Sequence, residues 1–416
     1  MRNFWFQFKS RCFNPFWNLL TFILNLFIRR DIHIALFGSR NRDRFSGNSR
    51  FVFQYLAENK EQYGFSHVVW VTENPSVVNE LTSMGYECYM IHSIKSIYFH
   101  LKAGWHVCCG NRSPANTATK EVKTDIIVKF SKGAKCIFMF HVISFPKRWQ
   151  RDDMTLYKSS FEKFMLKCFY AFLKNRFIRD NILYTGDWGN PIYVGYDKKL
   201  AAFEENKDIK LILTSYPALH SVVRFMPEEQ DLIKNFFGRK VILYTPTFRA
   251  VKKTDYKSPL ENEVFVRFLR DNRLLWVEKL HALADDSMKA SRYEPDISLL
   301  LDDKFDINVI CQKVDVMVTD YSSTYQKAVF YHIPFAFWGN DLDNYNAYDS
   351  GVNHEFMEFA GNLLCKDINS LIKTLSEMIK PDWVDAHKDL YEKGRKLYFN
   401  TPDDSLETIC NKLFKD

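Results

Sequence analysis

Small hydroxyl side chains follow an apolar run at residues 314–318. The run leads into Asp320, Ser322, Ser323 and Thr324, and the residues after them have helical character. Hydroxyl groups and free backbone N–H groups at the start of a helix can all point toward one phosphate. The same residue types also favour an ordinary helix N-cap, so this turn alone leaves two interpretations open.

Three more apolar runs end in side chains that could act on a phosphate. Cations hold the charge of a diphosphate, and an imidazole can take a proton from an attacking hydroxyl. A single histidine is more often an ordinary polar residue, but repetition at the ends of the runs favours transfer to or from a diphosphate. The runs and the residues that follow them are 135–140 before His141, 240–244 before Thr247 and Arg249, and 274–277 before Lys279 and His281.

The apolar runs alternate with helical patterns, which predicts βαβ units and parallel sheets. Ligands of such sheets bind at the carboxyl ends of the strands, where these candidate residues lie. Residues 184–196 are rich in glycine and aromatic residues and indicate a loop. The predicted strands are 32–37, 67–71, 86–91, 105–109 and 135–140 in a first set, then 211–214, 240–244, 274–277, 314–318 and 335–338 in a second, with mostly helix to residue 416.

Composition and motifs narrow the class of protein. The chain has 416 residues, of which 46% are hydrophobic and 26% charged, so we expect a globular protein. The two successive sets of alternating strands and helices, each about 200 residues long, predict two α/β domains facing across a cleft. A net charge of +7 suits an anionic substrate or membrane surface. Neither GxGxxG nor GxxxxGK[ST] occurs, so dinucleotide redox chemistry and P-loop hydrolysis are unsupported. Nine cysteines without a CxxC pair indicate reduced thiols in the cytosol.

Residues 1–30 form a basic, amphipathic segment with five Lys or Arg residues and no acidic residue. The apolar stretch is too short and too polar to span a bilayer, which takes about 20 apolar residues. One interpretation is a helix lying on the anionic inner leaflet, which predicts a peripheral protein on the cytoplasmic face of the membrane. The other is a helix packed on the protein's own core. The residues on its apolar face are Phe16, Leu19, Leu20, Ile23, Leu24 and Phe27.

The chain resembles the CDP-glycerol glycerophosphotransferase family, bacterial enzymes that prime and polymerise teichoic acids and related phosphopolyol polymers. The resemblance extends from about residue 32 to about residue 390. Its most characteristic run, Thr-Asp-Tyr-Ser-Ser, stands unaltered at residues 319–323. Three other family elements are matched in order and spacing by residues 140–142, 245–249 and 278–282.

The resemblance implies a GT-B architecture of two Rossmann-like domains, with the donor bound mainly by the second. The expected divisions are a membrane-association helix at 1–30, an acceptor domain at 31–210, a nucleotide-donor domain at 211–380, and C-terminal helices at 381–416 that could cross back to the first domain. The implied reaction transfers glycerol phosphate, or a related polyol phosphate, from a CDP-activated donor to an acceptor hydroxyl and releases CMP.

The resemblance also implies roles for individual residues. His141 is the expected general base on the acceptor, and His281 is expected to assist at the donor phosphates or the leaving group. The acceptor would be a polymer or a lipid-linked saccharide. The residues need no cofactor or metal; Asp341 and Asp343 could hold an ion, but loop acids more commonly face solvent. The expected donor-binding residues are Thr247, Arg249, Lys279, Asp320, Ser322, Ser323 and Thr324.

Three departures from the family pattern leave alternatives open. Val142 replaces the glycine after the family's histidine, residues 215–220 lack an expected Arg and Asp, and Gln326 stands where an Asp usually follows the Ser-Ser pair. One alternative is a donor that carries a different polyol, such as ribitol. The others are a GT-B glycosyltransferase that uses a nucleotide sugar and a non-catalytic paralogue that acts as an assembly partner. Nucleic-acid binding is not expected, because the basic residues are dispersed and match no recognition motif.

Overall fold

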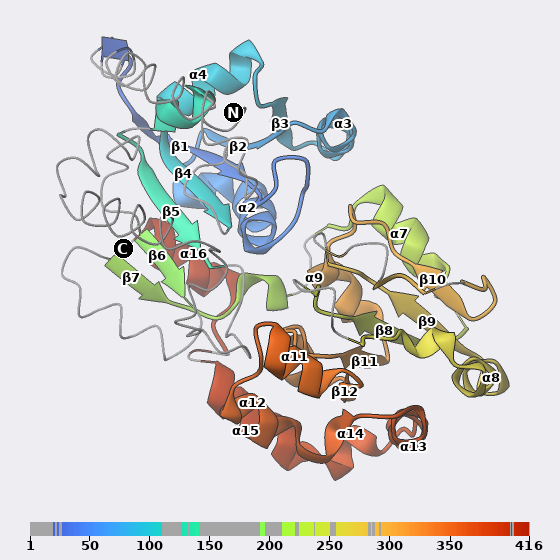
Figure 1. The fold of residues 1–416 in the computed structure, drawn as a ribbon. Helices are drawn as coiled ribbons and strands as arrows, with labels where there is room; N and C mark the ends of the chain where they lie inside the picture. The colour runs from blue at the N-terminus through green and yellow to red at the C-terminus, as the bar shows by residue number, and fades with distance from the viewer. Residues whose placement is uncertain are drawn as a thin grey trace, which may run out of the picture.

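The computed structural model contains two separate sheets with helices packed around them (Figure 1). It describes residues 20–109 without 21, 22, 25 and 26, residues 126–140 without 132, residues 192–195, and residues 210–415 without short gaps at 221–223, 237, 250–254, 282–283, 285–287, 291–292, 400 and 402. Every strand pairing between the described residues is parallel, so the predicted α/β class with parallel sheets is confirmed.

The first sheet has seven strands in the order β3-β2-β1-β4-β5-β6-β7. β1 and β4 pair with each other near its centre, and most of their residues are apolar and buried. We call the part of the chain that builds this sheet the first half. The strands are β1 (Asp31–Gly38), β2 (His67–Thr72), β3 (Glu87–Met90), β4 (Ala103–Cys109), β5 (Lys135–Met139), β6 (Ile192–Gly195) and β7 (Lys210–Leu213).

The second sheet has six strands in the order β10-β9-β8-β11-β12-β13, and the chain that builds it is the second half. Its two central strands, β8 and β11, are the ones that lead into residues 245–249 and 319–324. The strands are β8 (Lys240–Thr245), β9 (Leu274–Glu278), β10 (Ser298–Leu300), β11 (Val316–Thr319), β12 (Phe335–Trp338) and β13 (Leu364–Cys365).

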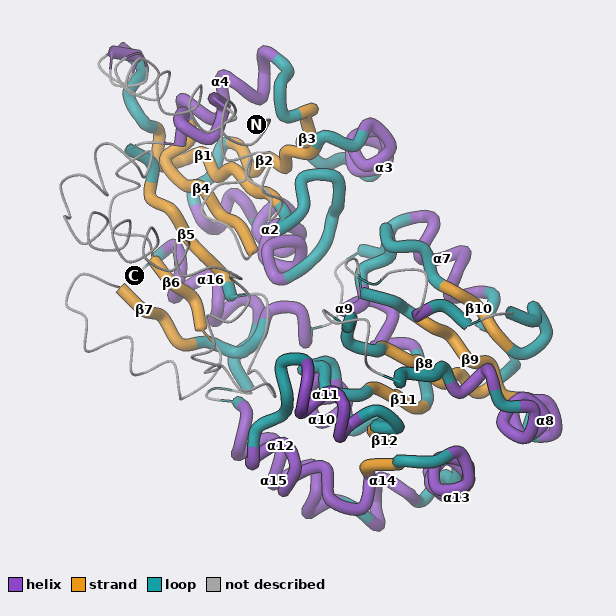
Figure 2. The backbone as a smooth tube through the Cα atoms, in the orientation of Figure 1, coloured by secondary structure: helices purple, strands orange, loops and turns teal. Residues whose placement is uncertain are grey.

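Helices cover both faces of each sheet (Figure 2). On the first sheet, α2 packs over β1, β2 and β4, and α4 lies on the opposite face. On the second, α10 packs against β11 and β12, while α8 and α13 lie on the other face. The helices are α2 (Asn48–Glu58), α3 (Pro75–Ser83), α4 (Ile94–Lys102), α7 (Pro227–Lys234), α8 (Glu263–Asp271), α9 (Ile307–Ile310), α10 (Tyr325–Tyr331), α11 (Leu342–Tyr348), α12 (His354–Ala360), α13 (Ile368–Met378), α14 (Trp383–Ala386), α15 (Lys388–Tyr398) and α16 (Leu406–Phe414).

The structure corrects the sequence prediction at several strands. Residues 184–196 do not form loop throughout, because β6 lies within them and pairs with both β5 and β7. The strand predicted at 211–214 belongs to the first sheet, not to the second half. The short strands β10 and β13 were not predicted; they are the two edge strands of the second sheet, and β13 has only two residues.

The two halves share one hydrophobic core. A single buried cluster contains Phe37 and Val107 from the first sheet together with Leu243 and Met317 from the second. The last helix, α16, lies against α2 in the first half, where the Phe414 ring is 5.3 Å from that of Trp105 and 5.5 Å from that of Phe65. The end of the chain therefore contributes to the core of the first half.

The described part of the N-terminal segment presents apolar side chains in two directions. Leu24 and Ile28 pack on the core beneath α4. Ile23 is 41% exposed and Phe27 is 81% exposed. Both interpretations of the N-terminal segment therefore stay predictions. No helix among the described residues is long and apolar enough to cross a membrane.

Candidate active site

The hydroxyl turn after β11 is tied to the end of β8 by a chain of hydrogen bonds. Thr319 Oγ1 donates to the carbonyl oxygen of Thr245 over 2.6 Å, and Thr245 Oγ1 donates to Thr324 Oγ1 over 3.0 Å. Thr324 Oγ1 in turn donates to Ser322 Oγ over 2.7 Å. Thr324 occupies the N-cap position of α10 without a capping bond from its side chain, and Ser322, Ser323 and Thr324 all remain partly exposed. The hydroxyls of Ser322 and Thr324 are thus held by hydrogen bonds, and all three side chains are partly accessible to a ligand.

Asp320 lies beneath this turn as a fully buried carboxylate. Its two oxygens accept the backbone N–H of Thr247 at 2.8 and 3.0 Å. Oδ2 also accepts from Arg249 Nη1 at 2.8 Å. Because these groups sit on the loop after β8, Asp320 fixes that loop against the turn after β11.

Arg249 is held inside the protein by two carboxylates and a set of aromatic rings. Its Nε and Nη2 donate to the two oxygens of Asp341 at 2.7 and 3.0 Å. Tyr321 donates its phenol to the same carboxylate, and the Arg249 guanidinium lies 5.0 to 5.1 Å from the rings of Tyr256, Tyr321 and Tyr345. Burial lowers the pKa of Arg249, but the two carboxylates outweigh it and hold the pKa above its ordinary value. Its positive charge is therefore already matched by Asp320 and Asp341.

Lys279 projects from the end of β9 and is also largely buried. Its Nζ donates to the carbonyl oxygen of Asp302 and to Asp303 Oδ1, both at 3.0 Å. Arg44, from the first half, pairs with the other oxygen of Asp303. Burial lowers the pKa of Lys279, and the Asp303 carboxylate partly offsets this. Asp303 thus links a predicted donor-binding residue to the first half.

His281 lies exposed on the loop after β9, with its ring 4.8 Å from the ring of Phe248. Phe248 stands between Thr247 and Arg249, so the loops after β8 and β9 meet at this point. His141 lies outside the described residues. The residue before it, Phe140, is fixed by Asn48, whose Nδ2 donates to the Phe140 carbonyl oxygen over 2.7 Å.

The structure thus brings together the predicted residues of the second half at the ends of β8, β9 and β11. Their roles in binding and catalysis stay predictions. Asp341, considered above as a possible metal ligand, is engaged by Arg249 and Tyr321. Among the residues that the structure describes, no group of three or more His, Cys, Asp or Glu side chains could hold a metal ion.

Glu278 is a residue near the site that the sequence prediction did not single out. It ends β9 as a fully buried carboxylate, and its Oε2 accepts a hydrogen bond from the Tyr293 phenol at 2.8 Å. Burial raises the pKa of Glu278 to about 7. The sequence signal that could have identified Glu278 is its position as an acidic residue directly after the apolar run 274–277.

Comparison with known proteins gives a consistent result. The model of the CDP-glycerol:poly(glycerophosphate) glycerophosphotransferase family matches residues 20–415. The chain is 21% identical over 396 residues to the teichoic acid glycerol-phosphate primase of Bacillus subtilis (strain 168), covering 92% of this chain and 93% of that protein. It is 22% identical over 386 residues to the teichoic acid poly(glycerol phosphate) polymerase of Bacillus spizizenii, covering 88% and 90%.

A solved structure of the wall teichoic acid polymerase TagF has the same fold. It superposes with a TM-score of 0.66 at 16% identity and covers 100% of this chain and 98% of its own. Since the family model spans nearly the whole sequence, the chain belongs to the CDP-glycerol:poly(glycerophosphate) glycerophosphotransferase family.

Proposed function

We propose that the protein transfers glycerol phosphate, or a related polyol phosphate, from a CDP-activated donor to an acceptor hydroxyl in the synthesis of a teichoic-acid-like or capsular polymer. The family match over residues 20–415 carries this proposal. The primase and polymerase relatives, by their names, act in teichoic acid synthesis, and each aligns over most of its own length.

In the proposed reaction, the acceptor hydroxyl oxygen attacks the phosphorus that carries the glycerol. A new P–O bond forms, the P–O bond to the bridging oxygen breaks, and that oxygen leaves with CMP. His141 takes the proton of the hydroxyl, and His281 stabilises the leaving phosphate. Ser322 and Ser323 donate hydrogen bonds to the diphosphate, and Thr324, whose hydroxyl proton goes to Ser322 Oγ, orients the Ser322 hydroxyl.

Arg249 and Asp320 serve this site from inside the fold. The bonds from Asp320 to Thr247 N and Arg249 Nη1 hold the loop after β8 in one position. A fixed loop loses no conformational freedom when the donor binds, which favours both binding and catalysis. We therefore assign Arg249 and Asp320 positioning roles and reserve direct donor contact for the exposed hydroxyls and His281.

We further propose a GT-B arrangement in which the two halves are domains that face each other across the site. Since β7 pairs within the first sheet, we propose a domain boundary after β7 and not at residue 210. The exposed side chains of Ile23 and Phe27, in a segment rich in basic residues, support peripheral attachment to an anionic membrane on its cytoplasmic face.

A transfer assay with a donor panel tests the proposal. We expect CMP release from CDP-glycerol or CDP-ribitol, and no UDP release from UDP-sugars, when an acceptor is present. His141→Ala should keep donor affinity and lose about 10²- to 10⁴-fold in rate, because it removes a general base. His354→Ala, at an exposed position in α12, is the matched control. Turnover of a UDP-sugar would instead make the protein a glycosyltransferase, and an unchanged rate in the His141 variant would remove that residue from the mechanism.

A further inference from the structure

Lys327 is a buried cation in the first turn of α10, directly after the turn that carries Ser322, Ser323 and Thr324. Its backbone N–H donates to the carbonyl oxygen of Thr324 over 3.0 Å, so these two residues lie on the same side of the helical turn. Side chains on a helix lean toward its N-terminus, which directs Lys327 back toward the hydroxyl turn. The residue is 7% exposed and is therefore largely withdrawn from water.

The ammonium group of Lys327 has no counter-ion. Within the part of the chain that the structure describes, it forms neither an ion pair nor a hydrogen bond, and it lies 4.6 Å from the centre of the Tyr216 ring. Burial lowers the pKa of Lys327, and neighbouring groups, Asp306 among them, offset only part of this effect. The oxygens of Asp306 already accept from Gly47 N, Asn308 N and Asn308 Nδ2. A buried charge without a partner is costly, which indicates that an anion pairs with Lys327 when a ligand is bound.

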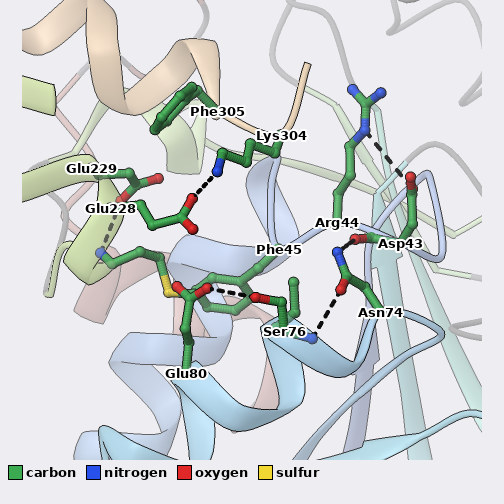
Figure 3. Close-up of a pocket in the computed structure, with 12 residues that line it drawn as sticks. Asp43, Arg44, Phe45, Asn74, Ser76, Glu80, Glu228, Glu229, Lys304 and Phe305 are labelled. Carbon is green, nitrogen blue, oxygen red and sulfur yellow. Dashed lines mark hydrogen bonds and ion pairs between the residues drawn. The ribbon is translucent and has the colours of Figure 1, made fainter. Parts of the chain in front are cut away.

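The cations already described at the site and at the contact between the two halves are matched by carboxylates. A diphosphate carries negative charge on both phosphates, and the hydroxyls of the turn after β11 supply hydrogen bonds but no positive charge. Lys327 supplies the charge that the matched cations do not. The matched pairs are Arg249 with Asp320 and Asp341, Lys279 and Arg44 with Asp303, Arg50 with Glu229, and Lys304 with Glu228, the last of which is drawn in Figure 3.

Lys327 also lies where the hydroxyl turn of the second half meets the first half. Tyr216, whose ring it covers, stands two residues before Ala218, and Ala218 N donates to Asn48 Oδ1 over 3.0 Å. Asn48 Nδ2 donates to the carbonyl oxygen of Phe140 at the end of β5. The residue after Phe140 is the predicted general base. A phosphate held by Lys327 would therefore lie between the donor-binding turn and the strand end that leads to this base.

We propose that Lys327 binds the diphosphate of the donor as a cationic contact, together with the hydroxyls of Ser322 and Ser323. The inference rests on the proposed function and adds one cation to the donor contacts named there. The first turn of α10 contains no acidic residue that could take up this charge.

Calorimetric binding of CDP-glycerol to Lys327→Met is the first test. Methionine has a similar length but no charge, so CDP-glycerol should bind about 10- to 100-fold more weakly, the effect of losing a hydrogen bond between charged groups. Lys373→Met, at an exposed position in α13, should bind the donor like the wild type. Equal affinities of the two variants, in a protein that transfers glycerol phosphate, would overturn the inference. No transfer from any CDP-polyol by the wild type would instead refute the proposed function.

The stability of the same variant separates ligand binding from a structural role. An ammonium without a counter-ion destabilises the fold, so the unfolding temperature of ligand-free Lys327→Met should equal or exceed that of the wild type. Saturating CDP-glycerol should then raise the unfolding temperature of the wild type more than that of the variant at the same concentration. A ligand-free variant that unfolds at a lower temperature than the wild type would show that Asp306 or Tyr216 already compensates the charge, which contradicts the inference.

A ligand series identifies the group that Lys327 contacts. Cytidine has no phosphate, so its ability to displace CDP-glycerol should be the same for the wild type and Lys327→Met. A loss confined to CDP-glycerol would assign Lys327 to the phosphate that carries the glycerol, and an equal loss for CMP would assign it to the phosphate next to the nucleoside; both outcomes support the proposal. An equal loss for cytidine, or a raised acceptor KM with unchanged donor affinity, would overturn it.

Discussion

Glu278 shows how one buried group makes stability depend on pH. The pKa of Glu278 is about 7 in the folded protein against an ordinary 4.5, because burial disfavours the charged carboxylate. As pH rises through this window the unfolded chain releases the proton first, so ionisation favours unfolding. The wild type should therefore lose up to about 3 kcal/mol of stability between about pH 4.5 and pH 7, and no more above it.

Glu278→Gln should abolish this dependence, because the amide does not ionise. We expect the variant to gain stability relative to the wild type as pH rises through the window, measured by urea unfolding at each pH. Glu377→Gln, at an exposed position in α13, should follow the wild type. If the unfolding free energies of wild type and Glu278→Gln changed in parallel with pH, the Glu278 carboxyl would ionise in the folded protein as it does in the unfolded chain.

Arg249 presents the opposite situation, in which a buried charge is fully compensated. Removing it would leave the Asp320 and Asp341 carboxylates buried without a cation. We expect Arg249→Met to lose about 3 to 5 kcal/mol of unfolding free energy, measured with urea at neutral pH. Arg270→Met, which removes an exposed arginine with two surface ion pairs, should leave stability nearly unchanged. Equal effects of the two substitutions would mean that the Arg249 cluster contributes no more than a surface pair.

The strand-to-helix turn after β11 is the element on which donor binding depends in the proposed function. Ser322 Oγ accepts from Thr324 Oγ1 and keeps its own proton available for a phosphate oxygen. Ser322→Ala should therefore weaken CDP-glycerol binding about tenfold, the value of a lost hydrogen bond to a charged group, measured by calorimetry. Ser376→Ala, whose hydroxyl bonds only within α13, should bind the donor like the wild type. Unchanged affinity in the Ser322 variant would exclude the turn from the donor site.

The elements were predictable where each one carries its own signal. The runs 240–244, 274–277 and 335–338 are apolar over most of a strand length, and the structure confirms them as β8, β9 and β12. β6 was missed because it has only four residues and the last of them is Gly195, so its strand character comes from its neighbours β5 and β7 and not from local sequence. The sheet to which β7 belongs is likewise set by pairing between distant segments.

The candidate site was predictable to the same extent. Strand ends in a parallel sheet must share an edge, so the meeting of residues 245–249 with the turn at 319–324 follows from topology. The partners of the charged groups do not follow from topology. The pairing of Arg249 with Asp341, 92 residues later, depends on how α11 packs, and no local pattern encodes it.

A buried ion pair joins the two halves of the molecule. Arg50 in α2 donates two hydrogen bonds to Glu229 in α7, at 2.6 and 2.8 Å, and both side chains are almost completely buried. Neighbouring backbone groups add to the same contact: Gly47 N donates to Asp306 Oδ2 and Ala218 N to Asn48 Oδ1, each at 3.0 Å. The position of one half relative to the other is thus fixed by polar groups within a shared apolar core.

A double-mutant cycle on this pair tests whether it holds the halves together or only fixes their orientation. Arg50→Met and Glu229→Met should each cost about 3 to 5 kcal/mol, because each leaves one buried charge without its partner. The double variant should be less destabilised than either single variant, since methionine pairs of similar volume need no compensation in an apolar core. Urea unfolding measures all three, and the exposed pair Lys304 and Glu228, taken through the same cycle, should show a coupling of about 0.5 kcal/mol or less. Strictly additive losses at Arg50 and Glu229 would mean that the two charges are solvated independently and that apolar packing alone fixes the two halves.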